Sequence, residues 1–473
     1  MDRIIHASAT ALAGAIAAKE VSSREVVAAH LAQIEKHNAA INAVVTLDAE
    51  RALARAGEAD AATARGESWG PLHGVPITLK DTLETAGLRT TSGFEPLRDH
   101  IPARDASAVA RLKGAGAVPL GKTNTPTLAM DFQTHNPIFG RSNNPWDVTR
   151  ATGGSSGGSA ASIAAGFSAL ELGTDIGGSV RIPAHYCGVV SLKTTERRVP
   201  MTGHIAVAPG QPRGIRHMDT IGPIGRSLDD LELALRLISG PDGIDWEVPP
   251  PAFPAAAKRE ISSLRLLWSD DLGAIRPDAA TRATVTALAG HLDRAGARVE
   301  RLDASSFGQA EALDAFRRLI GIEIAASNDP RDAERLARQF PGGVDATFRA
   351  HVELLARRDT LLAQLENLLA ECDALLLPVC VTPAIPHTKS GEPITVDGRQ
   401  LSYFDAGTAY TAPFNLTGSP VVVLPAGRSP EGLPIGVQVV GRKWREIELL
   451  GVARAIQQVT GPVAVPPGFE GAR

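Results

Sequence analysis

Cysteine is scarce in this sequence, and neither cysteine nor histidine forms a pattern that indicates a metal site. The 473 residues include only Cys187, Cys372 and Cys380, an odd count without metal-ligand spacing. Free thiols are typical of a reducing compartment, and Cys187 lies in an apolar stretch that we expect in the core. We therefore expect a cytoplasmic protein that holds no metal.

A strong excess of charge and a long apolar run are also missing. The chain has 48 Lys and Arg against 52 Asp and Glu, a formal net charge of -4, and these charges are spread along the sequence. Without a basic patch we expect neither a nucleic-acid partner nor an anionic membrane surface. No run reaches the roughly 18 apolar residues of a membrane span. The apolar residues 10–18 run into Lys19 and Glu20 without a cleavage pattern, so we expect no signal peptide.

The residues that are present favour a large α/β protein. Hydrophobic residues make up 44% of the chain, enough for a large core. Residues 264–268 and 299–302 predict strands on either side of a helix that Gly296 closes. Ser22 and Glu25 have the spacing of a capping box at a helix start. Further short apolar runs predict buried strands at residues 374–377, 421–424 and 437–440, whereas 241–254 and 383–398 predict long surface loops.

Two serines in glycine-rich frames and one lysine carry the chemistry of the chain. Ser155 lies in residues 153–159, Ser179 lies in residues 173–179, and Lys80 ends the apolar run 75–79, which predicts a buried strand. A serine hydroxyl needs a neighbouring base to become a nucleophile, and a lysine can act as that base when burial lowers its pKa. The alternative is a lysine that reaches solvent or pairs with Asp81.

The glycines have a role of their own. Backbone N–H groups can approach a developing oxyanion only where no side chain blocks them, and residues 176–179 supply four consecutive amides. A Gly-Ser-rich run is otherwise typical of a linker. Residues 160–172, which follow the first run, are apolar and helix-like, and this argues against a linker.

Together the three motifs resemble the signature of the amidase signature family, serine hydrolases that use a Ser–cis-Ser–Lys triad. The resemblance is dense over about residues 5–240 and looser beyond them. It implies one α/β domain over residues 1–473, with a large mixed twisted β-sheet covered by helices on both faces. It also implies a more variable region at about residues 241–400.

The resemblance implies a role for each motif residue. Ser179 resembles the nucleophile, Ser155 the cis-serine after Gly154, and Lys80 the base. The remaining residues implied are the backbone amides of Ile176, Gly177, Gly178 and Ser179 as the oxyanion hole, Thr174, Asp175 and Arg181 around the nucleophile, and Ala129, Met130 and Phe132 as the substrate pocket. Asp175 and Arg181 are expected as an ion pair that holds the loop, with a solvated surface pair as the alternative. For the pocket residues the alternative is a place in the core.

The implied function is hydrolysis of amide C–N bonds through an acyl-enzyme, without metal or organic cofactor. An apolar pocket predicts neutral hydrophobic or aryl amides, with aryl esters and carbamates (urethanes) able to enter the same cycle. Arg213, Arg216 and His217 could instead favour an acidic group if their loop forms the pocket rim. We expect a small-molecule substrate, and a homodimer stays open.

Other functions compete with this one. The amidase subunit of a glutamine-dependent tRNA amidotransferase shares the triad, although Ile176, Ile182 and the missing basic patch favour a stand-alone hydrolase. A Ser-His-Asp α/β-hydrolase is the enzymatic alternative, because Gly153-x-Ser155-x-Gly157 matches a nucleophile elbow and three histidines follow it, His291, His351 and His387. That elbow should follow a buried strand, whereas residues 143–152 are polar and predict a loop.

Residues 116–123 also match the P-loop pattern. A real P-loop follows a strand and opens a helix, whereas here a helix is expected before the motif and a strand through it. Pro119 also removes an amide donor. We therefore expect Lys122 to be structural.

Overall fold

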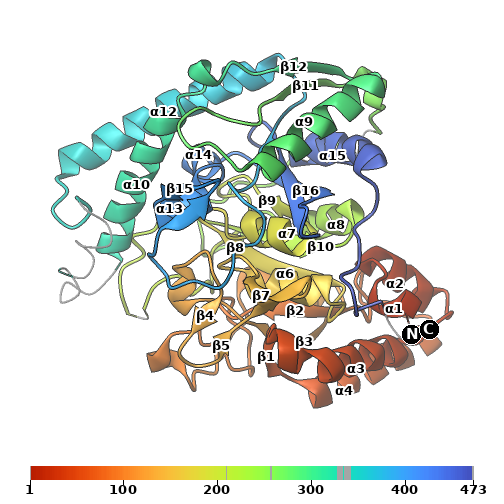
Figure 1. Ribbon diagram of the computed structural model, residues 1–473. Helices are drawn as coiled ribbons and strands as arrows, with labels where there is room; N and C mark the ends of the chain where they lie inside the picture. The colour runs from red at the N-terminus through yellow and green to blue at the C-terminus, as the bar shows by residue number, and fades with distance from the viewer. Residues whose placement is uncertain (1, 209, 256–257, 328–333, 335–341, 471–473) are drawn as a thin grey trace.

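A mixed sheet of eleven strands runs through the molecule and draws on both halves of the chain (Figure 1). The computed structural model describes residues 2–208, 210–255, 258–327, 334 and 342–470. The predicted α/β class with a large mixed sheet is confirmed. In spatial order the strands are β1 (Val44–Leu47), β3 (Val118–Thr123), β2 (Pro76–Lys80), β8 (Leu170–Asp175), β10 (Thr220–Gly225), β9 (Val190–Lys193), β16 (Val421–Arg428), β17 (Pro434–Val440), β13 (Ala374–Pro378), β11 (Arg265–Trp268) and β12 (Arg298–Arg301).

Helices flank the sheet, and three short hairpins lie outside it. The helices are α1 (Asp2–Ile5), α2 (Ala9–Ala17), α3 (Ser23–Ile41), α4 (Ala49–Ala64), α5 (Ser107–Gly114), α6 (Gly157–Ala164), α7 (Arg181–Cys187), α8 (Leu228–Ile238), α9 (Ala279–Arg294), α10 (Gln309–Ala326), α12 (Phe348–Ala370), α13 (Tyr403–Thr408), α14 (Ala412–Leu416) and α15 (Glu446–Thr460). The hairpins pair β4 (His135–Asn136) with β5 (Gly140–Arg141), β6 (Asn143–Asn144) with β7 (Asp147–Ala151), and β14 (Ile394–Val396) with β15 (Arg399–Leu401). None of the described helices combines the length and the apolar character needed to cross a membrane.

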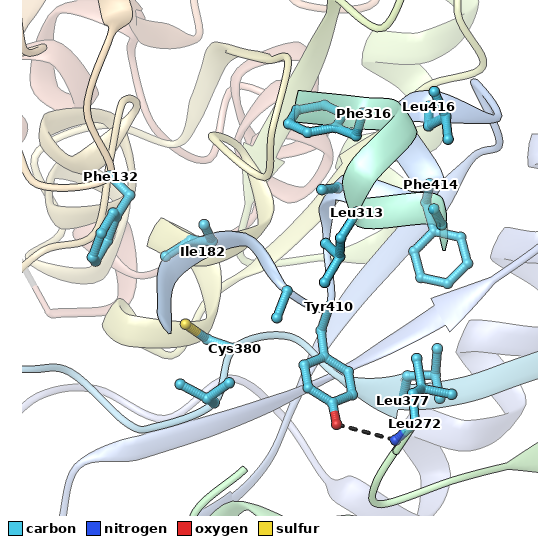
Figure 2. Packing of buried hydrophobic residues seen from close by; sticks show 14 of the residues in the cluster. Phe132, Ile182, Leu272, Leu313, Phe316, Leu377, Cys380, Tyr410, Phe414 and Leu416 are labelled. Carbon is cyan, nitrogen blue, oxygen red and sulfur yellow. Dashed lines mark hydrogen bonds between the residues drawn. The ribbon is translucent and has the colours of Figure 1, made fainter. Parts of the chain in front are cut away.

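Both faces of the sheet are buried, as the alternation along β13 shows. Ala374 and Leu376 pack in one apolar cluster with side chains of α9 and α15. Leu375 and Leu377 pack in another, with side chains of α10 and α12. Successive side chains of a strand point to opposite faces, so helices cover this strand on each side. Figure 2 shows part of the second cluster, where the Tyr410 hydroxyl accepts the Leu272 N–H at 3.2 Å.

Local signals set most element ends. The capping box at Ser22 is present, since its hydroxyl accepts the Glu25 N–H and the Glu25 carboxylate accepts the Ser22 N–H. Gly296, with φ of +98°, follows α9 in a conformation that suits glycine. Cys187 is buried, as expected for a core residue.

Three predictions about elements are wrong. Residues 383–398 are not a surface loop throughout, because β14 lies within them and pairs with β15. Residues 160–172 do not form one helix, because Gly166, with φ of +72°, follows the end of α6 and the chain enters β8 at Leu170. Residues 143–152 are not a plain loop, because they contain the β6–β7 hairpin. Its polar side chains are accommodated because β7 is only partly buried.

The topology brings the two glycine-serine motifs to the carboxyl edge of the sheet. β2 and β8 are parallel neighbours with Leu79 opposite Leu172, so Lys80 at the end of β2 lies beside the end of β8. Carboxyl ends of parallel strands are where α/β proteins place their ligands. Ser155 lies just before α6, and Ser179 lies in the turn between β8 and α7.

Candidate active site

Lys80 is fully buried and bound to a serine. Its Nζ donates to Ser155 Oγ at 2.6 Å and to Thr174 Oγ1 at 2.8 Å, and its exposed fraction is 0%. The neighbouring Asp81 instead accepts hydrogen bonds from the Thr91 N–H and hydroxyl. The solvent-facing lysine and the Lys80–Asp81 pair are therefore excluded by the geometry.

Burial changes the acidity of this lysine. Desolvation lowers the pKa of the Lys80 ammonium to about 7, although the carboxylates of Asp219, Asp175 and Glu171 act in the opposite direction. A lysine with this pKa is neutral in about half of the molecules at pH 7. Lys80 can thus both accept a proton from Ser155 and return it near neutral pH.

The loop that carries Ser155 is tied to the loop that carries Ser179. The peptide between Gly154 and Ser155 is cis. A Cβ on Gly154 would come within 2.7 Å of the Phe132 carbonyl carbon, so only glycine fits there. The Ser156 N–H donates to the Ser179 carbonyl at 3.1 Å, which fixes the two segments side by side.

One of the four backbone amides predicted for the oxyanion hole is not free to bind an oxyanion. The Gly178 N–H donates to Asp175 Oδ1 at 2.8 Å and is already committed. That part of the prediction is corrected, because an amide that serves a carboxylate is a weaker donor toward a second anion. The N–H groups of Ile176, Gly177 and Ser179 have no hydrogen bond among the described residues, and they remain the candidate donors.

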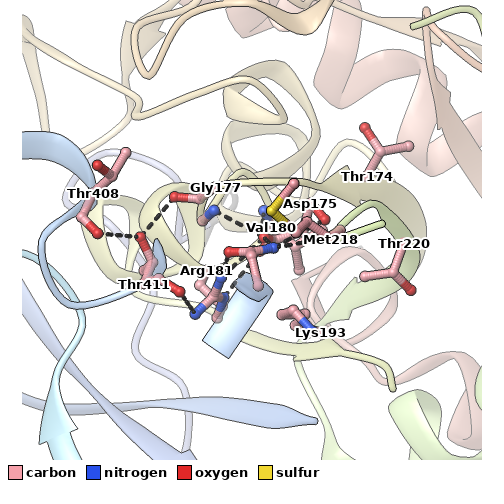
Figure 3. A network of polar contacts seen from close by, with 12 residues as sticks. Thr174, Asp175, Gly177, Val180, Arg181, Lys193, Met218, Thr220, Thr408 and Thr411 are labelled. Atoms are coloured by element: carbon pink, nitrogen blue, oxygen red, sulfur yellow. Dashed lines mark hydrogen bonds and ion pairs between the residues drawn. The ribbon is translucent and has the colours of Figure 1, made fainter. Parts of the chain in front are cut away.

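Asp175 and Arg181 form a buried ion pair under the Ser179 turn (Figure 3). Arg181 Nη2 lies 3.0 Å from Asp175 Oδ1, and both side chains are 0% exposed, so the pair is not a solvated surface pair. The arginine also donates to the Thr411 carbonyl at 3.0 Å and to Gln438 Oε1 at 2.8 Å. Asn415 completes the set, donating to Asp175 Oδ1 at 2.8 Å and accepting from Arg181.

This network keeps the aspartate ionised. Desolvation raises the pKa of the Asp175 carboxyl, but Arg181, Lys193 and Asn415 outweigh that effect, and the net pKa lies well below its usual value. An ionised Asp175 accepts the N–H groups of Gly178 and Val180, so it fixes the backbone on both sides of Ser179. The network therefore positions the serine without contacting the reacting atoms.

Replacing Asn415 by alanine tests this positioning role. We expect the free energy of unfolding to fall by about 1–3 kcal/mol, because the buried Arg181 and Asp175 each lose a hydrogen bond. We also expect kcat for amide hydrolysis to fall about tenfold or more, with a smaller change in KM. Denaturant unfolding and steady-state kinetics measure both. Asn143→Ala is the matched control, because Asn143 makes one exposed hydrogen bond to Ala40. Equal effects of the two substitutions on kcat would contradict the role.

A cavity of about 580 Å³ opens on Ser179. Its apolar wall comes from Ala129, Met130, Phe132, Ile176, Ile182, Phe316, Ile320, Ile324 and Phe404, and its polar residues include Asp131, Ser390, Ser402, Tyr403 and Thr408. Figure 2 shows how Phe132, Ile182 and Phe316 come from segments far apart in the sequence. Phe132 is 7% exposed, and it packs in the core as well as lining the cavity.

The arginine loop does not form the rim of this cavity. Arg213 and Arg216 line a separate cavity of about 80 Å³, and Arg213 pairs with Asp245 at 3.2 Å. His217 is held by the Glu323 carboxylate on α10. Neither arginine lines the cavity at Ser179, so the described residues do not meet the condition under which this loop would select an acidic group there.

The histidines of the α/β-hydrolase alternative lie elsewhere. His387 Nε2 contacts the Val148 carbonyl at 3.3 Å, while His291 lies on α9 and His351 on α12. The basic group on Ser155 is Lys80, so the elbow motif does not mark a Ser-His-Asp triad here. The P-loop lysine is structural, since Lys122 Nζ donates to the Leu83 carbonyl and to Thr85 Oγ1 from inside β3.

Several residues of the site could not be found from local motifs. Asn415 and Gln438 come from α14 and β17, more than 230 residues after Arg181. Asp219 precedes β10, and its carboxylate acts on the Lys80 ammonium. Gln438 lies inside the predicted strand 437–440, but no motif in the sequence marks Gln438, Asn415 or Asp219 as part of the site.

Known proteins match the chain over nearly its whole length. A model of the amidase family matches residues 25–450. A glutamyl-tRNA(Gln) amidotransferase subunit of Moorella thermoacetica is 36% identical, covering 93% of this chain and 94% of that protein. The structure of 6-aminohexanoate cyclic dimer hydrolase superposes with a TM-score of 0.82 at 30% identity, over 99% of this chain and 100% of that one. A bacterial aryl acylamidase superposes with a TM-score of 0.84 over 96% of each chain, but its 24% identity shows the fold alone.

The relatives correct the expectation about partners. Proteins 33–36% identical over at least 93% of this chain are named as subunits of an amidotransferase for glutamyl-tRNA(Gln). The prediction of a stand-alone enzyme without a nucleic-acid partner is contradicted by this finding. Its physical basis was weak, because the net charge of one chain does not report which molecules an assembly of several chains binds.

Proposed function

We propose that this chain, which belongs to the amidase signature family, hydrolyses carboxamides through an acyl-enzyme on Ser179. The observation that carries the proposal is the buried hydrogen bond of 2.6 Å from Lys80 Nζ to Ser155 Oγ, beside the serine that faces the cavity. Burial lowers the pKa of this lysine to about 7, so it can exchange protons with Ser155 near neutral pH. It is well suited to proton transfer.

The proposed reaction starts with proton transfer along the two serines. Neutral Lys80 takes the proton of Ser155, Ser155 takes that of Ser179, and Ser179 Oγ attacks the carbonyl carbon. The tetrahedral oxyanion is stabilised by the N–H groups of residues 176, 177 and 179. The proton then returns through Ser155 to the leaving nitrogen as the C–N bond breaks. Water attacks the acyl-enzyme and gives a proton through Ser155 to Lys80. The ester bond to Ser179 Oγ then breaks as the proton returns to that oxygen, and the carboxylic acid leaves.

Two observations favour different acyl groups. The names of the relatives favour glutamine, with this chain as the amidase subunit of a tRNA-dependent amidotransferase, and among the comparisons this reading has the most support. The cavity favours an acyl group with an apolar body, because nine of its side chains are apolar. Free glutamine also brings a carboxylate, and no lysine, arginine or histidine lies among the described residues that line the cavity.

A panel of substrates separates the two candidates. We expect kcat/KM for a neutral acyl 4-nitroanilide to exceed that for L-glutamine about tenfold or more with the purified chain, because the glutamine carboxylate would stay unpaired. The matching aryl ester and aryl carbamate belong in the same panel, since the oxyanion donors act on the carbonyl alone. Anilide release is followed by absorbance and ammonia by a coupled assay. A preference for glutamine would contradict the apolar-acyl candidate and favour the role in an amidotransferase.

A further inference from the structure

One carboxylate lines the mostly apolar cavity, and it has no cationic partner among the described residues. Asp131 lies in the wall with Tyr403 and Ser390. Its hydrogen bonds come from neutral donors: the Tyr403 hydroxyl at 2.5 Å, the Gln133 N–H at 3.2 Å and the Ser390 hydroxyl. Arg317, whose guanidinium lies over the Phe404 ring, is already paired with Asp405. The negative charge of Asp131 is therefore uncompensated by the described residues around it.

The hydrogen bonds leave room for one more donor. A carboxylate accepts about four hydrogen bonds, and three are used here. Asp131 is half-buried, so water can reach its remaining position in the free protein. A ligand that enters the cavity removes this water, and shielding a charge beside apolar side chains is costly unless an opposite charge or further donors reach it. A donor on the ligand would offset this cost.

The charge of Asp131 is not needed to connect this segment to its neighbours in the fold. Gln133 Nε2 donates to the Thr388 carbonyl and to the Tyr403 hydroxyl, both at 2.9 Å, and Gln133 Oε1 accepts the Thr388 N–H at 3.1 Å. These three hydrogen bonds already connect Gln133 to Tyr403 at the start of α13 and to Thr388 in the segment that precedes α13. A neutral side chain at position 131 could supply the remaining contacts. The carboxylate therefore has a function other than this connection.

We propose that Asp131 binds an ammonium group carried by the acyl part of the substrate. The substrate class is then amides of amino-substituted acyl chains, whose methylenes pack on the apolar wall while the ammonium donates to Asp131. This inference rests on the proposed function, because it assumes that the acyl part occupies the cavity at Ser179. A charge-assisted hydrogen bond away from the reacting carbonyl contributes binding and selectivity rather than chemistry.

Matched pairs of substrates test the proposal. Straight-chain acyl 4-nitroanilides of four to seven carbons are compared, each ending in a methyl group or in an ammonium group. We expect wild-type kcat/KM to favour the ammonium member of at least one pair about tenfold or more. In Asp131→Asn this ratio should fall about ten- to a hundredfold, with kcat/KM for the methyl-ended member rising. Asp131→Glu should restore part of the preference.

Two further variants keep the result interpretable. Asp147→Asn removes an exposed carboxylate that is bonded to Thr149, and it should leave the ratio unchanged. Tyr403→Phe removes one neutral donor but keeps the charge, so it should retain the preference for ammonium. A ratio near one in the wild type for all pairs, or an equal ratio in the wild type and Asp131→Asn, would overturn the inference while neutral anilide hydrolysis persists. Absence of all anilide hydrolysis would instead reject the proposed function.

Discussion

Replacing Ser179 by alanine should reduce amide turnover by about 10⁴- to 10⁶-fold, because no acyl-enzyme can form without its hydroxyl. The side chain faces the cavity and is 8% exposed, so the lost oxygen leaves the packing of the protein almost intact. We therefore expect the thermal unfolding midpoint to stay close to that of the wild type. Single-turnover kinetics with a 4-nitroanilide measure the loss.

Covalent labelling identifies the nucleophile independently of turnover. A fluorophosphonate probe should modify Ser179 in the wild type and nothing in Ser179→Ala. Ser159→Ala is the matched control, because Ser159 lies in the first glycine-serine motif and bonds to Thr123 Oγ1. That variant should be labelled like the wild type. Modification of Ser155 or Ser156 in place of Ser179 would show that the assignment is wrong.

Replacing Lys80 by methionine should remove the pH dependence of the reaction together with most of its rate. Desolvation lowers the pKa of Lys80 to about 7, and only the neutral amine can accept the serine proton. The wild-type rate should therefore rise with pH, reach half its plateau near pH 7 and stay high above it. The variant should lose about 10²- to 10⁴-fold for amides, less for esters, and lack the step near pH 7. Rate profiles from pH 5 to 9 measure both.

The lowered pKa of Lys80 should also make the stability of the protein depend on pH. In the unfolded chain the Lys80 pKa returns to about 10.4, so unfolding between about pH 7 and pH 10 takes up a proton. The contribution of Lys80 to wild-type stability therefore falls as pH is lowered through that window and is constant below it. Lys80→Met lacks this penalty and should unfold at a higher temperature at pH 7. Lys122→Met is the control, a second buried lysine whose pKa falls to about 8 without contact to a serine. A wild-type pH profile retained in Lys80→Met would contradict the relay.

The motif residues could be predicted because their chemistry is local. The two serines and their glycines are contiguous in sequence, and the end of an apolar strand places Lys80 in the interior. The partners of Arg181 could not be predicted, because α14 and β17 reach it only through the fold of the whole sheet. The hydrogen bond from the Gly178 N–H to Asp175, which removes this amide from the oxyanion hole, could not be predicted either. It depends on how tightly the turn closes.

The acyl group of the substrate could not be predicted from the sequence for the same reason, because the residues around it come from distant parts of the chain. Residues 129–132 were expected to line the pocket, but other parts of the cavity wall come from α10 and α13, whose position beside Ser179 depends on the fold as a whole. The unpaired charge of Asp131 also emerges only when every neighbour is known. Composition was least informative about partners, because a chain of balanced charge can belong to an assembly whose other chains contact nucleic acid.

The contacts of Arg181 have a consequence for biosynthesis. When translation has reached residue 240, Lys80, Ser155 and Ser179 have already been synthesised. Arg181 still lacks its partners Thr411, Asn415 and Gln438. Until those residues emerge, the Asp175 carboxylate and the Ser179 turn lack their later supports. We therefore expect a nascent or truncated chain to stay inactive even though the three proposed catalytic residues have been translated. Activity is expected only from chains that extend past Gln438.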